Sequence, residues 1–134
     1  MKIVLVTDSY YGENGGCVAT RRLTEGLKKR GHKVSIVATD VKGEGAYAVK
    51  GKNPSIFGDS LTKMQFLFGI PEKDVLRKAF ADADIIQIQL PFYLGYGSAK
   101  LARSMNKCFM AGHHVQAHNV VAAAGKDSRI LDAI

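Results

Sequence analysis

The sequence predicts an α/β fold in which a doubly wound, mostly parallel sheet lies between two layers of helices. Short apolar runs rich in β-branched residues alternate along the chain with segments of helical periodicity. The runs lack the polar alternation of a half-exposed strand, which is typical of strands covered on both faces. The 134 residues, of which 46% are hydrophobic, have the size of a single domain and can bury a core.

The first forty residues predict a βαβ unit. A strand is expected over residues 2–7, and a loop rich in turn formers follows it over residues 8–16. Residues 17–30 predict an amphipathic helix that ends at Gly31, and a second, parallel strand over residues 34–39. The face of this helix expected against the sheet consists of Ala19, Leu23, Gly26 and Leu27.

The middle of the chain carries weaker patterns. Residues 47–49 predict a short strand, and the apolar residues 61–68 predict a short helix. Pro71 is typical of a first helical turn, so a second longer helix is expected from there to about Phe80.

The second half of the chain completes a four-stranded parallel sheet. The third strand is expected over residues 85–90 and the fourth over residues 107–112. Between them we expect an aromatic, glycine-bearing loop at residues 92–97 and a helix at residues 98–106. The apolar tail, residues 120–134, predicts a further helix.

Composition limits the classes of function. The net charge of +7, from 19 Lys and Arg against 12 Asp and Glu, suits nucleic acid, an anionic membrane or phosphorylated small molecules. No apolar stretch approaches the ~20 residues of a membrane helix, and no signal peptide follows Met1. With only two cysteines, Cys17 and Cys108, a reducing, cytoplasmic location is expected.

Basic side chains gather on and after the first helix, with no aromatic residues between them. A plain solvated helix face is the commonest meaning of such a cluster, and an anionic membrane is the second. The lack of aromatic side chains argues against nucleic acid. The cluster consists of Arg21, Arg22, Lys28, Lys29, Arg30 and Lys33.

Ligands of doubly wound sheets bind beyond the carboxyl ends of the strands. Three loops are expected there, at residues 8–16, 90–97 and 112–119. In the first, Gly15 and Gly16 begin a helix, where bare backbone N–H groups can approach a phosphate. Their spacing matches neither G-x-G-x-x-G nor a Walker A loop, and a tight turn that needs positive φ would explain the pair equally well.

The other two loops carry aromatic, amide and histidine side chains. The residues after the third strand suit contact with a sugar or a lipid, or they pack in the ordinary way: Gln87, Gln89, Pro91, Phe92, Tyr93 and Tyr96. After the fourth strand stand His113, His114 and His118, which lack the ligand spacing of a zinc site, so no metal is expected. A contact from His114 to a ligand, surface histidines and a buried, hydrogen-bonded histidine all remain open.

Three segments resemble family 4 glycosyltransferases. Residues 2–39 carry the opening strand, the Gly-Gly loop and the helix pattern L-x-x-x-L-x-x-x-G-H-x-V, here Leu23, Leu27, Gly31, His32 and Val34. Residues 81–103 are similar to the strand of the family that ends in proline, and residues 110–119 to its next strand, which ends in a histidine.

The resemblance implies the N-terminal half of a GT-B fold, in which two Rossmann-like domains enclose the reaction. It implies transfer of a hexosyl group from a nucleotide-sugar to an acceptor, with retention and without a metal. Gly15 and Gly16 match the loop that approaches the phosphates of the donor, and His114 matches the histidine that contacts the transferred sugar. The acceptor-side wall is matched by Pro91 and its neighbours Phe92 and Tyr93.

The sequence departs from the family in two places. Gly12 stands near the position of a common proline, and the E-x7-E carboxylates of the donor-binding C-terminal domain do not occur. We therefore expect residues 1–134 to be a single Rossmann-like, acceptor-side domain of a truncated enzyme, inactive without its missing partner domain. The basic charge suggests a lipid-linked acceptor and peripheral contact with the inner face of an anionic membrane.

Two alternatives come from other classes of protein. One is a stand-alone Rossmann-like module that binds a phosphorylated ligand or nucleotide. The other is a flavodoxin-like or response-regulator-like signalling domain, for which only Asp8 and Asp40 fit loosely.

Overall fold

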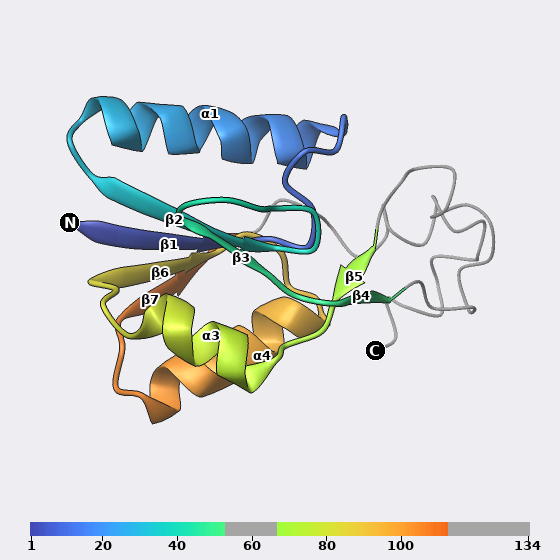
Figure 1. Ribbon diagram of the computed structural model, residues 1–134, viewed down its shortest axis with the longest axis vertical. Helices are drawn as coiled ribbons and strands as arrows, with labels where there is room; N and C mark the ends of the chain where they lie inside the picture. Colours follow the sequence, from blue (N-terminus) through green and yellow to red (C-terminus); the bar gives the residue numbers. More distant parts are fainter. Residues whose placement is uncertain (53–66, 113–134) are drawn as a thin grey trace.

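A computed structural model describes residues 1–52 and 67–112 of the chain (Figure 1). Its main strands are β1 (Lys2–Val6), β2 (Lys33–Ala38), β3 (Ala46–Ala48), β6 (Ile85–Ile88) and β7 (Phe109–Ala111). The helices are α1 (Gly15–Lys29), α3 (Lys73–Phe80) and α4 (Tyr93–Ser104). Two short strands, β4 (Gly51–Lys52) and β5 (Phe68–Gly69), pair antiparallel in a separate small sheet.

The main sheet is parallel throughout, in the order β3-β2-β1-β6-β7. From β1 the chain first extends the sheet through β2 to β3, and later returns to the other edge of β1 with β6 and β7. The order therefore reverses at β1, which confirms the doubly wound α/β, Rossmann-like class. The sheet has five strands rather than the expected four, because the segment around Tyr47 pairs with β2.

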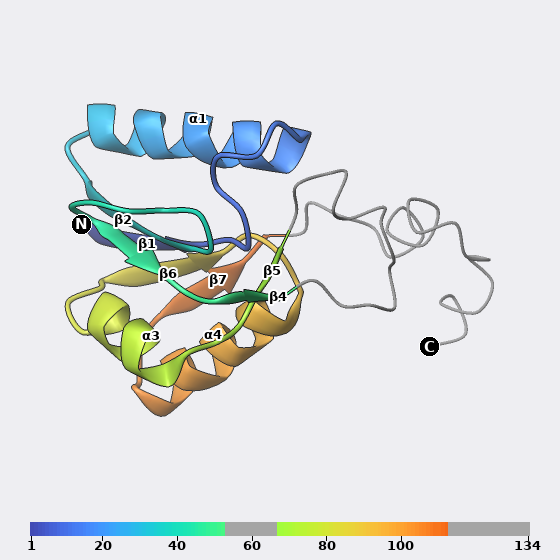
Figure 2. The ribbon, with the colours of Figure 1, turned by 45° about the vertical axis from the view of Figure 1, so that its right-hand side comes forward.

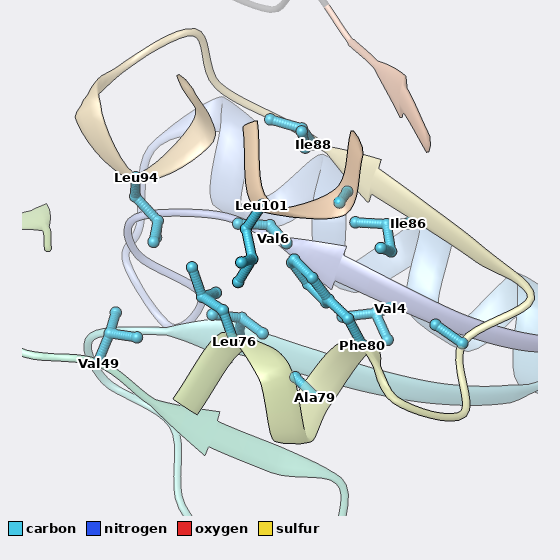
Figure 3. Close-up of a cluster of buried hydrophobic side chains, with 13 residues drawn as sticks. Val4, Val6, Val49, Leu76, Ala79, Phe80, Ile86, Ile88, Leu94 and Leu101 are labelled. Atoms are coloured by element: carbon cyan, nitrogen blue, oxygen red, sulfur yellow. The ribbon is translucent and has the colours of Figure 1, made fainter. Parts of the chain in front are cut away.

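Helices cover both faces of the sheet, with α1 on one face and α3 and α4 side by side on the other (Figures 1 and 2). Side chains of β1 alternate between the two resulting cores. Ile3 and Leu5 pack in the core beneath α1, whereas Val4 and Val6 pack with Phe80 beneath α3 and α4 (Figure 3). This three-layer αβα arrangement explains why the strand sequence shows no polar alternation.

Helix α1 begins and ends as its sequence indicates. The side-chain oxygen of Asn14 accepts the N–H of Cys17 at 3.0 Å, which makes Asn14 the N-cap. At the other end Gly31 has φ of 88°, the left-handed conformation that glycine adopts at little cost after a C-cap.

The face of α1 that packs on the sheet differs from the expected one. Ala19 and Gly26 are exposed, and the buried residues of the helix are Cys17, Thr20 and Thr24, with Leu23 and Leu27 half-buried. The threonine hydroxyls need no partner outside the helix, because each donates to the carbonyl oxygen four residues earlier, at 2.8 and 2.9 Å. These internal hydrogen bonds allow a polar residue type on the inner face.

The segment expected as an aromatic loop at residues 92–97 is instead the start of a helix. Helix α4 begins at Tyr93 rather than at residue 98, and its buried face includes Leu94, Gly95 and Ser98. The glycines that suggested a loop are needed for close packing: a Cβ on Gly95 would overlap the carbonyl oxygen of Leu90, and one on Gly97 would overlap the ring of Pro71. The helix can start there because these two glycines let it approach its neighbours.

Two further expectations fall partly or wholly outside the described residues. The helix expected over residues 61–68 is wrong at Leu67, which is not helical, and at Phe68, which lies in β5. Its part at 61–66 and the helix expected over residues 120–134 lie outside the described ranges. Among the described residues, no helix combines the length and apolar character that a membrane crossing requires.

The close approach of α4 to β6 predicts different outcomes for two glycine-to-alanine substitutions. Gly95→Ala is expected to lower the free energy of unfolding by about 1–3 kcal/mol, since the new methyl group would displace backbone. Gly26→Ala, at an exposed helical position with nothing within 4 Å, is the matched control and is expected to stabilise by up to ~1 kcal/mol. Chemical denaturation measures both, and equal stabilities would contradict the proposed packing.

Candidate functional site

The carboxyl ends of β1 and β6 lie side by side, because Val6 is paired with Ile88 in the register of these neighbouring strands. From this shared edge the chain leaves in opposite directions. After β1 it rises to α1 on one face, and after β6 it enters α4 on the other (Figure 1). Ligands of doubly wound sheets bind at the edge where the strand order reverses. Two of the three expected loops, after residues 7 and 89, therefore meet at this edge.

Asp8 is the buried acid of this edge, with 1% of its surface exposed. Its Oδ2 accepts the N–H of Gly69 at 2.7 Å, and its carbonyl oxygen accepts both the N–H and the hydroxyl of Thr39. Burial raises the pKa of the Asp8 carboxyl from its usual 3.8 to about 6, although the hydrogen bond from Gly69 acts in the opposite direction. Asp8 therefore ties β5 and the end of β2 to the end of β1.

Asp40 shapes the loop that leads to α1. One oxygen of its carboxylate accepts the hydroxyl of Ser9 at 3.0 Å and the N–H of Tyr11 at 2.9 Å, and the other accepts the N–H of Tyr10 at 2.8 Å. Three consecutive residues thus donate to one side chain, which lies just beyond the carboxyl end of β2. Hydrogen bonds to a charged acceptor are stronger than neutral ones, so the carboxylate is an effective centre for this turn.

Arg21 holds the same loop from the side of the helix. Its Nη1 donates to the carbonyl oxygens of Tyr10 and Gly12 at 2.6 and 2.9 Å. The buried Cys17 thiol also donates to the carbonyl oxygen of Ser9 at 3.3 Å. The backbone N–H groups of the loop therefore face Asp40 and its carbonyl groups face α1, which leaves the loop with a defined shape.

The loop ends at the glycine pair, in the first turn of α1. Gly15 is exposed and Gly16 is half-buried. Within the described part of the chain, no hydrogen bond occupies the N–H of either glycine, as usual for the first turn of a helix. Neither residue has positive φ, so a strained turn does not account for the pair. A Cβ on Gly15 would meet nothing within 4 Å, whereas one on Gly16 would lie 3.3 Å from Oδ1 of Asn14, so the open space is at Gly15.

The aromatic candidates lie on the other face of the same edge. Pro91 is exposed after β6, and Phe92 is the half-buried N-cap of α4. The ring of Phe92 meets that of Phe68 edge to face at a centroid separation of 5.0 Å, which joins the start of α4 to β5. Tyr93 begins the helix and is 64% exposed, so it is available for contact with a ligand.

The structure brings the glycine pair and the aromatic group to one edge but places them on opposite faces of the sheet (Figure 1). His114, with His113 and His118, lies outside the described residues, so its role stays a prediction. Among residues 1–52 and 67–112, no three His, Cys, Asp or Glu side chains gather as a metal centre would require.

Sequence reasoning missed the two residues that shape the loop and the structural part of Asp8. Asp8 and Asp40 share one signal, because each is an acid directly after a predicted strand that ends in threonine. This signal does not separate their environments, since Asp8 is buried and Asp40 is exposed. For Arg21 the sequence held no such signal, and its charge has the ordinary meaning of a charged residue on a helix surface.

The buried Asp8 carboxyl predicts how stability depends on pH. Between pH ~4 and ~6 the folded protein keeps a proton on Asp8 that the unfolded chain has released, so stability falls as pH rises through this window. The loss is at most about 3 kcal/mol, for a shift of about two pKa units. Denaturation of Asp8→Asn from pH 4 to 8 is expected to show a flatter profile and higher stability at pH 7. Asp82→Asn, at an exposed position, is the control; an unchanged slope in Asp8→Asn would contradict the assignment.

The Asp40 carboxylate predicts a local opening of the loop when its charge is removed. Asp40→Asn would turn an amide NH2 toward the N–H donors of the loop, and the buried Cys17 thiol is expected to react at least about tenfold faster with a thiol reagent. Cys108→Ser in the background removes the other thiol, which is exposed. Asp84→Asn is the matched control, because its carboxylate accepts the N–H of Lys2 at 2.7 Å at the opposite end of the sheet. Equal labelling rates in the two variants would contradict the role of Asp40.

Comparison with known protein families agrees with this geometry. The family model described as Glycosyltransferase Family 4 matches residues 14–132, a span that contains the glycine pair and the aromatic group. A search of curated proteins found no significant match. The match covers well over half of the 134 residues, and its Rossmann-like fold is the one that this sheet forms. The chain belongs to Glycosyltransferase Family 4.

Proposed function

We propose that the chain supplies the acceptor-side domain of a glycosyltransferase that takes a hexosyl group from a nucleotide-sugar donor. Membership of the family supports a glycosyltransferase-like role. The observation that carries the finer proposal is the glycine pair at the start of α1, whose N–H groups are free and which has open space at Gly15. In this proposal the phosphates of the donor approach Gly15 and Gly16, and the acceptor lies toward Pro91, Phe92 and Tyr93.

The chemistry of the site fits an anion at the glycine pair. The first turn of α1 contains no acidic residue, and the positive end of the helix dipole points out of that turn. The loop is already shaped by Asp40 and Arg21, so little ordering is needed when a phosphate arrives. We further propose retention of configuration, no need for a metal, and a contact from His114 to the transferred sugar.

The donor nucleotide belongs to another part of the proposed enzyme. The family resemblance places most of the nucleotide on a second domain with an E-x7-E motif, and no such motif occurs in these 134 residues. We therefore expect this chain alone to bind a nucleotide-sugar weakly, through its phosphate and sugar, and to transfer no sugar. The two free cysteines, Cys17 and Cys108, support a reducing compartment such as the cytoplasm.

Saturation-transfer NMR with UDP-glucose and GDP-mannose as probes tests this proposal. We expect saturation at the sugar protons of at least one probe and little at the protons of the base. Gly15→Leu is expected to remove the signal while keeping or raising the melting temperature, because leucine favours helix and its Cβ would meet nothing within 4 Å. Gly26→Leu is the matched control: it is an exposed glycine of the same helix, it also has nothing within 4 Å, and it should bind as the unmodified chain does.

Other outcomes would count against the proposal. Tight binding with saturation strongest at the base would favour a stand-alone nucleotide-binding module. Equal signals from Gly15→Leu and the unmodified chain would show that the glycine pair does not contact the donor. Turnover of a radiolabelled nucleotide-sugar by the 134 residues would contradict the need for a second domain.

A further inference from the structure

Helix α4 carries an exposed row of two tyrosines followed by two cations. The four residues are spaced three, four and three positions apart, which places them on one face of the helix. The tyrosines are 64% and 70% exposed, and both cations are also exposed. We name this row the α4 stripe; it consists of Tyr93, Tyr96, Lys100 and Arg103.

The α4 stripe lies opposite the buried face of the helix. The buried residues of α4 follow the complementary spacing: Leu94, Gly95, Ser98, Leu101 and Ala102. The stripe therefore points away from the sheet, and within residues 1–52 and 67–112 the two phenol rings stay largely exposed. Single exposed apolar residues are ordinary on a protein surface. Here two aromatic rings and two cations share one helix face, with the rings toward its N-terminus and the cations toward its C-terminus.

The chemistry of the α4 stripe fits the boundary between a lipid bilayer and water. Tyrosine rings sit at that boundary because their bodies are apolar and their hydroxyls are polar. Lys and Arg side chains lay their apolar stems along the surface and reach lipid phosphates with their charged ends. Helix α4 contains no acidic residue that would repel such phosphates.

The neighbouring helix strengthens the positive charge of this face. Helix α3 packs beside α4 (Figures 1 and 2) and exposes Lys73, Arg77 and Lys78 against a single acid within the helix, Asp74. The chain as a whole carries a net charge of +7. Complementarity of charge therefore favours an anionic surface over a neutral one.

We propose that the α4 stripe is the surface through which this protein docks on an anionic lipid bilayer. Tyr93 and Tyr96 enter the interface between headgroups and acyl chains, while Lys100 and Arg103 contact the lipid phosphates. The aromatic end of the stripe lies at the edge of the sheet where the candidate site stands. Docking needs no sugar transfer, so its failure and the failure of the proposed function are separate results.

The α1 helix offers a competing basic surface and hence an internal comparison. Its last turn exposes Lys28 and Lys29, but its exposed face carries no aromatic side chain and includes Glu25. Attraction by net charge alone would use both helices equally. Docking through the α4 stripe requires one helix and leaves the other free.

Co-sedimentation with vesicles of phosphatidylcholine, with and without phosphatidylglycerol, tests the proposal. We expect the protein to pellet with the anionic vesicles and to stay in solution with the neutral ones. Lys100→Glu/Arg103→Glu is expected to weaken partitioning at least about tenfold. Tyr93→Ser/Tyr96→Ser should weaken it several-fold without any change in charge.

The matched control is Lys28→Glu/Lys29→Glu in the last turn of α1, which changes the net charge by the same amount. Its binding to anionic vesicles is measured at several ionic strengths to correct for the change in total charge. The corrected binding is expected to equal that of the unmodified protein. Circular dichroism and melting temperature establish that each variant is folded.

Three results would overturn the proposal. Equal weakening by the α1 and α4 charge reversals would reduce the effect to net charge, and unchanged binding of the tyrosine variant would remove the aromatic contribution. An absence of binding to anionic vesicles would exclude a bilayer and point to an acidic protein as the partner of the α4 stripe.

Discussion

Strand β1 is hydrogen-bonded to a neighbour along each edge and buried on each face, and this constraint governs the rest of the structure. Its carboxyl end cannot use water to satisfy its polar groups, and an unpaired group there would cost about 1–3 kcal/mol. The N–H of Thr7 donates to Val37, and the carbonyl oxygen of Asp8 accepts from Thr39. In the loop that follows, the hydroxyl of Ser9 and the N–H of Tyr10 donate to the carboxylate of Asp40. The hydrogen bonds at the end of β1 therefore guide the chain toward the start of α1.

Much of this architecture follows from local sequence. Uninterrupted apolar runs predict buried parallel strands, and the change to helical spacing after the glycine pair predicts α1 and its end at Gly31. The same reasoning places Gly15, Gly16 and Pro91 at the carboxyl edge, because parallel strands all end there. These features depend on neighbours within a few residues, so pattern alone identifies them.

The remaining features depend on contacts between distant parts of the chain. Asp40 reaches residues about thirty positions earlier, and nothing in its own surroundings distinguishes it from an ordinary turn residue. Glycines in the segment at 92–97 suggest a loop, whereas Gly95 is there because α4 approaches the backbone of Leu90. Thr20 and Thr24 are polar residues that the sequence pattern would place on the exposed face of α1. They are buried because their hydroxyls donate to carbonyl oxygens of the same helix. Packing decides each case, and packing is not a local property.

The position of Asp40 also has a consequence for how the chain matures. The N–H groups of Tyr10 and Tyr11 gain their acceptor only when the end of β2 has docked beside β1, since the Asp40 carboxylate lies just beyond that end. A nascent chain that has emerged only as far as α1 has the partners of the loop on that helix, Arg21 and Cys17, but lacks the Asp40 carboxylate. The phosphate contact that we propose at the glycine pair therefore depends on closure of the whole βαβ unit and not on the loop alone.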